Sequence, residues 1–239
     1  MILDKKHEMQ RKLFRQFAET EFTKEIQDEL DETGEFNWDM HKKMARYGFM
    51  GVKIPKEYGG AGADSLTYAL MVEELARVDA VLSIYANTSN SLGGGPLLLG
   101  GNEAQKQKYL PAVASGEKIM VFGLTEPGAG SDAGGTPTAI ADGDDFIING
   151  RKCFISGAPM ADWAVVFAKT DLTAKGSKGI SMFVVDMKLP GVSLGAHEKK
   201  MGINGYPTCD LVLEDVRVSK DCLVGPLHKG FQIAMKTLD

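Results

Sequence analysis

The sequence between residues 122 and 132 reads Phe122-Gly123-Leu124-Thr125-Glu126-Pro127-Gly128-Ala129-Gly130-Ser131-Asp132. Two closely spaced glycines, Gly128 and Gly130, let backbone N–H groups approach a ligand closely. Thr125 and Ser131 add neutral hydroxyl groups, and Pro127 stiffens the turn. Read alone, the stretch is either a polar turn between domains or a ligand-binding loop. It does not lie between a strand and a helix of a βαβ unit, so the dinucleotide-binding fingerprint does not apply.

The hydrophobic period changes shortly before this stretch, near Gly116. On the N-terminal side, apolar residues recur at helical spacing on amphipathic segments. One apolar stripe runs from Met9 to Leu30, Asn37 is a candidate N-cap of a second helix, and Ser65 is a candidate cap of a third. Residues 55–64 are rich in glycine and predict a loop. The predicted helices cover residues 9–30, 38–48, 65–78 and 103–113.

On the C-terminal side, short β-rich runs replace the helical pattern. The dipeptide Asn149-Gly150 predicts a hairpin turn at the end of the first run. Several short strands at near-regular spacing favour an antiparallel sandwich or barrel over a doubly wound sheet. Another helix is expected to begin at Phe231. The predicted strands cover residues 146–150, 163–169, 180–186, 192–194 and 210–218.

Composition excludes several classes of function. Hydrophobic residues make up 44% and charged residues 25%, as in ordinary globular proteins. The net charge of −5 predicts no nucleic-acid partner, and no apolar run reaches the ~20 residues of a membrane span. Three widely spaced cysteines predict free thiols, and four scattered histidines predict no metal site. We expect a cytoplasmic protein, with the mitochondrial matrix open if a transit peptide was removed.

A second informative segment reads Asn149-Gly150-Arg151-Lys152-Cys153-Phe154-Ile155-Ser156-Gly157. An aromatic ring at Phe154 can cover one face of a flat cofactor. On a strand, the hydroxyl of Ser156 points to the same side, because side chains two residues apart share a face. By itself the segment is an ordinary hairpin.

Together the two segments resemble the two flavin-binding signatures of the acyl-CoA dehydrogenase family. One signature is of the type Leu-Thr-Glu-Pro-Gly-Ala-Gly-Ser-Asp, and the other of the type Asn-Gly-x-Lys-x-aromatic-Ile-Ser/Thr. Ser131 and Ser156 are separated by 25 positions, as the resemblance requires. Other stretches resemble the family in the same order, at residues 55–62, 105–111, 200–203, 213–218 and 230–235.

The resemblance implies an α+β multi-domain protein. An all-α helical N-terminal domain (1–117) would precede an antiparallel β-barrel middle domain (118–230), and residues 231–239 would begin a C-terminal helical domain. The family's catalytic base lies on that C-terminal domain, so no residue here is assigned as catalytic. The 239-residue chain alone is expected to be inactive. Glu126 lies in the motif, but the family uses that position structurally.

The resemblance also implies a set of site residues. Thr125 would hydrogen-bond the pyrimidine side of FAD, Ser156 would approach flavin N5, and Phe154 would pack on the isoalloxazine. Ser131 would also touch the CoA portion of the substrate, and Asp239 would open a substrate-site element. The implied FAD-binding residues are Phe122, Leu124, Thr125, Gly130, Ser131, Phe154, Ile155 and Ser156.

The implied reaction is α,β-dehydrogenation of a short-chain acyl-CoA to the trans-2-enoyl-CoA, or its reverse, as in fatty acid β-oxidation. Electron-transferring flavoprotein would be the redox partner, and the full-length protein would be a homo-oligomer, a homotetramer by family. Two alternatives stay open. One is a non-catalytic module that binds flavin, CoA or a partner chain, and the other is a flavin monooxygenase or oxidase on the same fold. The carboxylates of Glu73 and Glu74 are expected on an exposed face without partners.

Overall fold

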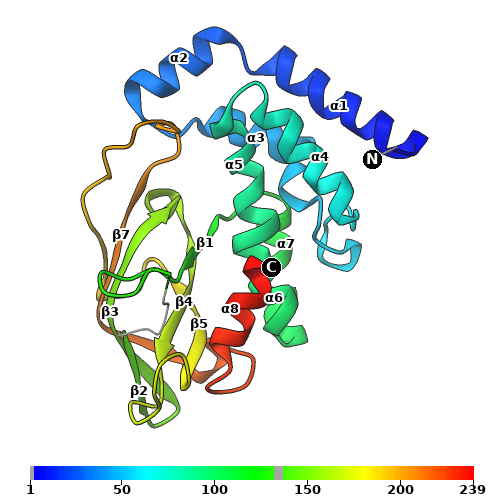
Figure 1. Ribbon diagram of the computed structural model, residues 1–239. Helices are drawn as coiled ribbons and strands as arrows, with labels where there is room; N and C mark the ends of the chain where they lie inside the picture. Colours follow the sequence, from blue (N-terminus) through cyan, green and yellow to red (C-terminus); the bar gives the residue numbers. More distant parts are fainter. Residues whose placement is uncertain (1–2, 132–136) are drawn as a thin grey trace.

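A computed structural model shows a helical N-terminal half lying beside a β-sheet, with the last helix returning to the helical side (Figure 1). The structure describes residues 3–131 and 137–239. The α-helices are α1 Lys5–Glu21, α2 Lys24–Thr33, α3 Trp38–Arg46, α4 Ser65–Ala76, α5 Ala80–Thr88, α6 Gly94–Gly100, α7 Glu103–Ala114 and α8 Gly230–Leu238. A π-helical turn, η3 Ser89–Gly93, joins α5 to α6, and 3₁₀ turns lie at η1 Phe49–Gly51, η2 Lys56–Tyr58, η4 Ala158–Met160 and η5 Lys220–Cys222. None of the described helices is both long and apolar enough to cross a membrane.

The single stripe predicted from Met9 to Leu30 is wrong in part. The chain breaks between α1 and α2, and Phe14 and Phe17 are the buried aromatic residues of α1. Met9 and Leu13 are 59% and 61% exposed. A step of four residues advances about 40° around a helix of 3.6 residues per turn. Met9, Leu13 and Phe17 step by four, and already at Leu13, one step before the buried Phe17, the stripe has left the buried face.

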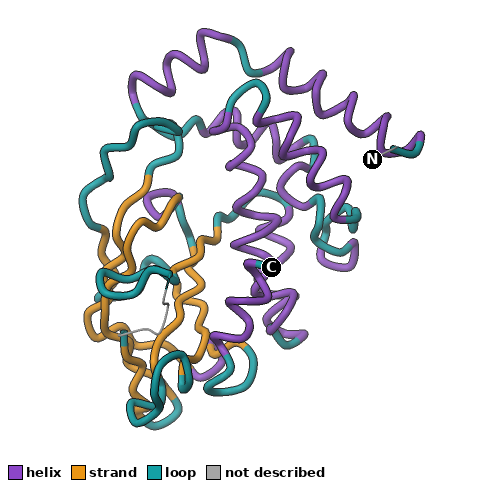
Figure 2. The backbone as a smooth tube through the Cα atoms, viewed as in Figure 1, coloured by secondary structure: helices purple, strands orange, loops and turns teal. Residues whose placement is uncertain are grey.

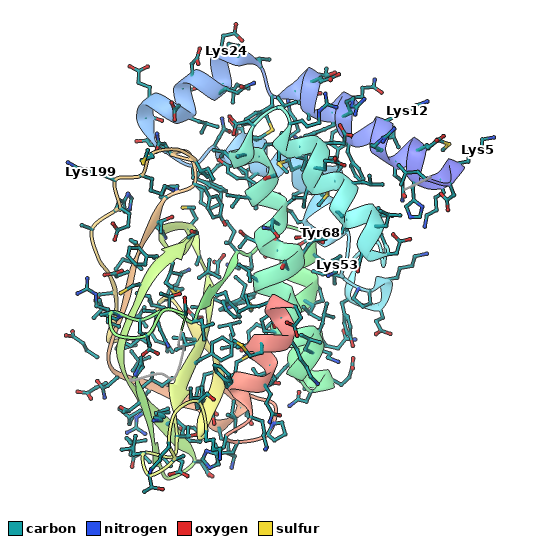
Figure 3. All side chains as sticks on the ribbon, viewed as in Figure 1. Lys5, Lys12, Lys24, Lys53, Tyr68 and Lys199 are labelled. Atoms are coloured by element: carbon teal, nitrogen blue, oxygen red, sulfur yellow. The ribbon has the colours of Figure 1, made fainter. Side chains whose placement is uncertain are left out.

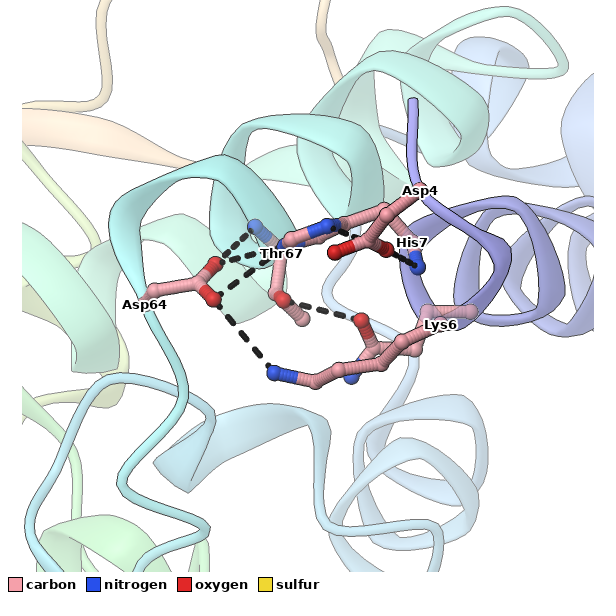
Figure 4. A network of polar contacts seen from close by, with 6 residues as sticks. Asp4, Lys6, His7, Asp64 and Thr67 are labelled. Carbon is pink, nitrogen blue, oxygen red and sulfur yellow. Dashed lines mark hydrogen bonds and ion pairs between the residues drawn. The ribbon is translucent and has the colours of Figure 1, made fainter. Parts of the chain in front are cut away.

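Helix α1 is fastened to the start of α4 by Asp64 (Figure 4). The Asp64 carboxylate accepts from Thr67 N at 2.8 Å and so caps α4, a role that the sequence assigned to Ser65. It also lies 3.1 Å from His7 Nε2 and 3.4 Å from Lys6 Nζ on α1. These hydrogen bonds hold the pKa of Asp64 far below its usual value, and the bond from the Thr67 backbone has the largest effect.

Glu74 of α4 is buried, and the prediction that it lies on an exposed face without partners is wrong. Its two carboxylate oxygens accept from Arg15 Nε and Nη2, each at 2.8 Å. Arg77 adds a further contact at 3.2 Å. A carboxylate on the inner face of α4 is tolerated because the forked guanidinium of α1 satisfies both oxygens.

The strands form one mixed sheet with the order β6-β7-β3-β2-β4-β5-β8, and β1 pairs with β4 off this path. The predicted antiparallel β-barrel is therefore wrong in two respects. In the described residues, the path ends at β6 and β8 without closing, and the β1–β4 and β2–β4 pairs are parallel. The strands are β1 Met120–Gly123, β2 Thr138–Asp142, β3 Asp145–Ser156, β4 Trp163–Lys169, β5 Ile180–Asp186, β6 Val192–Leu194, β7 Thr208–Ser219 and β8 Leu223–Val224.

Contacts of Asp162 align the starts of β1 and β4. The Asp162 carboxylate accepts from Ile119 N at 3.1 Å and from Lys118 Nζ at 2.8 Å, directly before β1 begins. Because Asp162 itself directly precedes β4, the two strands start at the same end of the sheet and run in the same direction. Alternating hydrophobicity is the same for parallel and antiparallel strands, so the sequence pattern could not show this.

The Asn149-Gly150 dipeptide does not form a hairpin turn. Strand β3 runs through it from Asp145 to Ser156, and the turn between β2 and β3 lies at Gly143 and Asp144. Gly150 adopts φ +148° beside a register shift in the β3–β7 pairing. A side chain here would meet Pro137, whose Cβ would lie 2.5 Å from an added Cβ. The dipeptide therefore serves a β-bulge, another use of glycine within a strand.

The segment between β6 and β7 joins the sheet to the helices (Figure 2). Tyr206 lies in this segment and donates to Thr88 Oγ1 of α5 at 2.9 Å. Tyr85 of α5 donates in return to Gly205 O at 3.1 Å. On the other side, Ile233 and Ala234 of α8 are buried with apolar residues of β4 and β5. The helical half and the sheet are thus held together at both ends.

Candidate functional site

A cleft of about 600 Å³ opens between the helical half and one end of the sheet. Helix α5 and η3 form one wall, β1 and the following loop form the floor, and the end of β3 forms the opposite wall. Helix α8 closes one side with Met235 and Leu238. The lining residues are Ile84, Asn87, Thr88, Leu92, Phe122, Leu124, Thr125, Gly130, Ser131, Phe154, Ile155, Ser156, Met235 and Leu238.

All eight residues that the sequence assigned to cofactor binding line this one cleft. They come from two segments that the fold brings together, 122–131 and 154–156. The predicted substrate residue Asp239 is not among the lining residues and is exposed at the end of α8. Asp132, the last residue of the first motif, lies outside the described residues.

Phe154 presents its ring to the cleft from an unusual backbone conformation. Its φ is +58°, in the left-handed region that bulky residues avoid, and it lies in a second register shift of β3. The buried Asp210 carboxylate accepts from Phe154 N at 3.3 Å and also pairs with Arg151. The ring is 64% exposed, which is rare for phenylalanine and leaves an apolar face open to a flat ligand. Strain of this kind is often found where a side chain must be held for function.

A buried ion pair lies behind the first motif. Lys152 Nζ donates to Glu126 Oε1 at 2.6 Å and to Leu124 O at 3.2 Å, and the two side chains are 0% and 2% exposed. Burial lowers the pKa of Lys152, and the adjacent Glu126 carboxylate opposes that decrease. Cys153 N donates to Thr125 O at 2.8 Å, so the loop is fixed at consecutive residues. Glu126 does not line the cleft, and its contacts give it a structural role.

The Ser156 hydroxyl is exposed to the cleft and is hydrogen-bonded from behind. Its Oγ lies 3.1 Å from Thr208 Oγ1 on the adjacent strand β7. Thr208 Oγ1 in turn accepts from Lys200 Nζ at 3.3 Å. Sequence reasoning noted the Lys200-Met201-Gly202 stretch only as part of a resemblance and did not connect it with Ser156.

The helical wall supplies residues that the sequence did not assign individually. Ile84 and Leu92 are apolar, and Asn87 places an amide among them. Asn87 Oδ1 accepts from the Tyr68 hydroxyl, and Lys53 Nζ lies 5.2 Å from the centre of the Tyr68 ring (Figure 3). The π-helical turn η3 contacts β1 and supplies Leu92 to this wall, and π-helical turns are often found at functional sites.

Two family profiles match the chain. The profile described as acyl-CoA dehydrogenase, N-terminal domain, matches residues 4–117, and the profile described as acyl-CoA dehydrogenase, middle domain, matches residues 121–216.

Curated relatives match the chain over its whole length. Caffeyl-CoA reductase-Etf complex subunit CarC of Acetobacterium woodii is 52% identical, with 100% of this chain and 63% of the relative covered. 3-(Aryl)acrylate reductase of Clostridium sporogenes is 54% identical, with the same coverage of 100% and 63%. The chain therefore spans about 63% of the length of these relatives.

Solved structures show the same fold. Butyryl-CoA dehydrogenase from Megasphaera elsdenii superposes with a TM-score of 0.93 at 37% identity, covering 100% of this chain and 63% of that chain. An acyl-CoA dehydrogenase complexed with FAD from Bacillus anthracis superposes with a TM-score of 0.89 at 37% identity, covering 99% of this chain and 40% of that chain. With both profiles, the relatives and the fold in agreement, the chain belongs to the acyl-CoA dehydrogenase family.

Proposed function

We propose that this chain provides the N-terminal and middle domains of a FAD-dependent oxidoreductase that acts on the α,β bond of acyl-CoA thioesters. The observation that carries the proposal is the convergence of both flavin signatures on one cleft. The proposed domains are residues 1–117, 118–230 and 231–239, the last belonging to a third, helical domain. The family is FAD-dependent, which makes FAD the cofactor to test.

The cleft has the features that a flavin requires. Its volume lies within the roughly 300–1,000 Å³ of small-molecule sites. One wall offers the exposed ring of Phe154, and the floor offers the hydroxyl of Thr125. An added Cβ at Gly130 would meet no atom of the described residues within 4 Å, so these residues leave the backbone there open to a ligand. These features support placing the isoalloxazine against Phe154, with its polar edge toward the motif loop.

The proposed reaction removes a proton from Cα and a hydride from Cβ of the acyl group, forming the 2-enoyl thioester. FAD supplies the acceptor of the two electrons when it is bound. Phe154 would cover one face of the cofactor, while Thr125 and Ser156 would donate hydrogen bonds to it. Ser131, at the exposed end of the loop, would contact the CoA portion. Among the described lining residues none carries a carboxylate, so the base must come from outside this lining.

As the physiological direction we propose the reverse of this reaction, the reduction of the 2-enoyl thioester. Both curated relatives described above carry names of reductases, one of caffeyl-CoA and the other of 3-(aryl)acrylate. Their identity with this chain, 52% and 54%, exceeds the 37% of the butyryl-CoA dehydrogenase. We therefore propose 3-aryl-2-enoyl-CoA as the first substrate class to test, with short-chain 2-enoyl-CoA as the second.

Partners and assembly follow as further proposals. One relative is named as a subunit of a complex with electron-transferring flavoprotein, which supports that partner here. A homo-oligomer and a cytoplasmic location stay predictions. A flavin oxidase or monooxygenase on this fold, and a non-catalytic flavin or CoA module, are the competing functions.

The test uses the protein that carries this chain at its natural length, loaded with FAD and kept anaerobic. The reduced flavin should be reoxidised by cinnamoyl-CoA, and the oxidised flavin should be bleached by 3-phenylpropionyl-CoA or butyryl-CoA. Fast reoxidation by oxygen without any response to either thioester would favour an oxidase. Retention of FAD with no response to thioesters or oxygen would favour the non-catalytic module.

A further inference from the structure

We propose that Lys200 is a positioning residue that orients a chain of hydrogen bonds through Thr208 to Ser156, so that the Ser156 hydroxyl acts as a donor toward the ligand in the cleft. The inference rests on the proposed function for the identity of that ligand, the flavin. It adds two residues that lie outside the flavin signatures and do not line the cleft.

The hydrogen bonds from Lys200 through Thr208 to Ser156 are continuous in the structure. Lys200 Nζ lies 3.3 Å from Thr208 Oγ1, and Thr208 Oγ1 lies 3.1 Å from Ser156 Oγ. Thr208 is buried, whereas Ser156 is exposed to the cleft. Ser156 and Thr208 are paired residues of β3 and β7, so the sheet register sets the distance between their hydroxyl groups.

Lys200 determines which of the two hydroxyl groups donates and which accepts. Two hydroxyl groups at 3.1 Å can exchange donor and acceptor roles, whereas a lysine ammonium can only donate. Thr208 Oγ1 accepts a hydrogen bond from Lys200 Nζ. Among the described residues, the acceptor for the hydroxyl proton of Thr208 is then Ser156 Oγ. Because a buried hydroxyl proton needs a partner, Thr208 donates to Ser156. The proton of Ser156 is thereby left to point into the cleft.

Lys200 is held in place independently of Thr208. Its Nζ donates to Tyr206 O at 2.6 Å, and Tyr206 is anchored to Thr88 on the helical wall of the cleft. Lys200 is half-buried, and this burial lowers its pKa. A poorly solvated charge polarises neighbouring hydroxyl groups more strongly than an exposed one.

The chemical consequence concerns the redox balance of the bound cofactor. A donor backed by a positive charge stabilises an acceptor that gains electron density. Removal of Lys200 should therefore make the two-electron midpoint potential of bound FAD more negative. It should also slow reduction by acyl-CoA by about tenfold, the order of effect seen when outer partners of a site are removed.

The test compares four single variants and one double variant of the natural-length protein loaded with FAD. Lys200→Met removes the charge, Lys200→Arg retains it, and Thr208→Val removes the connecting hydroxyl. Lys199→Met changes the neighbouring lysine, which is exposed (Figure 3). The measurements are the spectroelectrochemical midpoint potential, the visible flavin spectrum and the anaerobic reduction rate.

We expect Lys200→Met and Thr208→Val each to lower the potential and alter the flavin spectrum, while Lys199→Met and Lys200→Arg stay close to wild type. The double variant Lys200→Met/Thr208→Val should resemble either single variant, because both changes interrupt the same chain. An unchanged potential in Thr208→Val, or fully additive shifts in the double variant, would overturn the proposal. Failure of the wild-type protein to retain FAD would instead overturn the proposed function.

Discussion

Lys152 Nζ lies 2.6 Å from Glu126 Oε1, and the two side chains are almost completely buried behind the loop that carries Thr125. The lysine also donates to Leu124 O. The pair therefore joins the second motif to the first, and the two segments that sequence similarity linked only by spacing are linked physically. A charge buried away from solvent is costly to leave without its counter-charge.

Breaking this pair from one side should be costly. We expect Glu126→Gln to destabilise the protein by about 3–5 kcal/mol, because it leaves the buried Lys152 ammonium without its counter-charge. The double variant Glu126→Leu/Lys152→Met should recover most of that loss, since no buried charge then remains. Denaturant unfolding measures both changes.

The matched control is the exposed ion pair between Arg217 and Asp142, in which the side chains are 54% and 58% exposed. Asp142→Asn should change stability by at most about 1 kcal/mol. Equal effects of Glu126→Gln and Asp142→Asn would show that the buried pair contributes nothing special.

The bulge at Gly150 should not tolerate a side chain. Gly150→Ala would place a Cβ 2.5 Å from Pro137 Cβ at a residue with φ +148°. We expect a loss of about 1–3 kcal/mol from the clash and the strained backbone. Gly202→Ala is the control, because an added Cβ there meets no atom within 4 Å. If the two variants unfold at the same temperature in a thermal melt, Gly150 does not need to be a glycine, and this prediction is wrong.

Some elements could be predicted from the sequence because local physics determines them. The bounds of β4, β5 and β6 match the predicted strands, and Asn37 caps α3 through Met40 N as expected. The Asn149-Gly150 dipeptide was read wrongly because the same residues suit a turn and a bulge. The contact with Pro137 that favours the bulge comes from the residue directly before β2, thirteen positions earlier in the chain.

Some residues of the candidate site could likewise be predicted from the sequence, and others could not. Residues in the two motifs were found because each motif is contiguous, and all eight line the cleft. Thr208 and Lys200 were missed because they reach Ser156 only through the pairing of β3 with β7. Direction of strand pairing was also missed, since the Asp162 contacts that align β1 with β4 involve residues more than forty positions apart.

Tyr206 should make stability depend on alkaline pH. Burial raises its pKa from an ordinary 10 to about 12. Above pH 10 the unfolded chain loses this proton while the folded chain retains it. The contribution of Tyr206 is therefore complete below pH 10 and is lost as the pH rises toward about 12.

Tyr206→Phe removes the titrating group and the hydrogen bond to Thr88. We expect it to be about 1 kcal/mol less stable than wild type at pH 8, with a shallower loss of stability above pH 10. Urea unfolding at a series of pH values tests this. If the free energies of unfolding of the two proteins change in parallel with pH, the pKa of Tyr206 does not differ between the folded and unfolded states.

The final prediction concerns the cleft itself. Thr125 and Ser156 both line it, on segments fixed from behind by Leu124, Lys152 and Thr208. Because these segments cannot easily move away, a large apolar side chain at either position would occupy the space proposed for the flavin. We expect the natural-length variant Thr125→Leu/Ser156→Leu to retain much less FAD after gel filtration, and the remaining flavin to show a shifted visible spectrum. Ser193→Leu, at an exposed position of β6, should retain FAD like wild type. If the double variant keeps the affinity and spectrum of the wild-type protein, the flavin does not lie against these side chains, and the cleft between α5 and β3 binds something else.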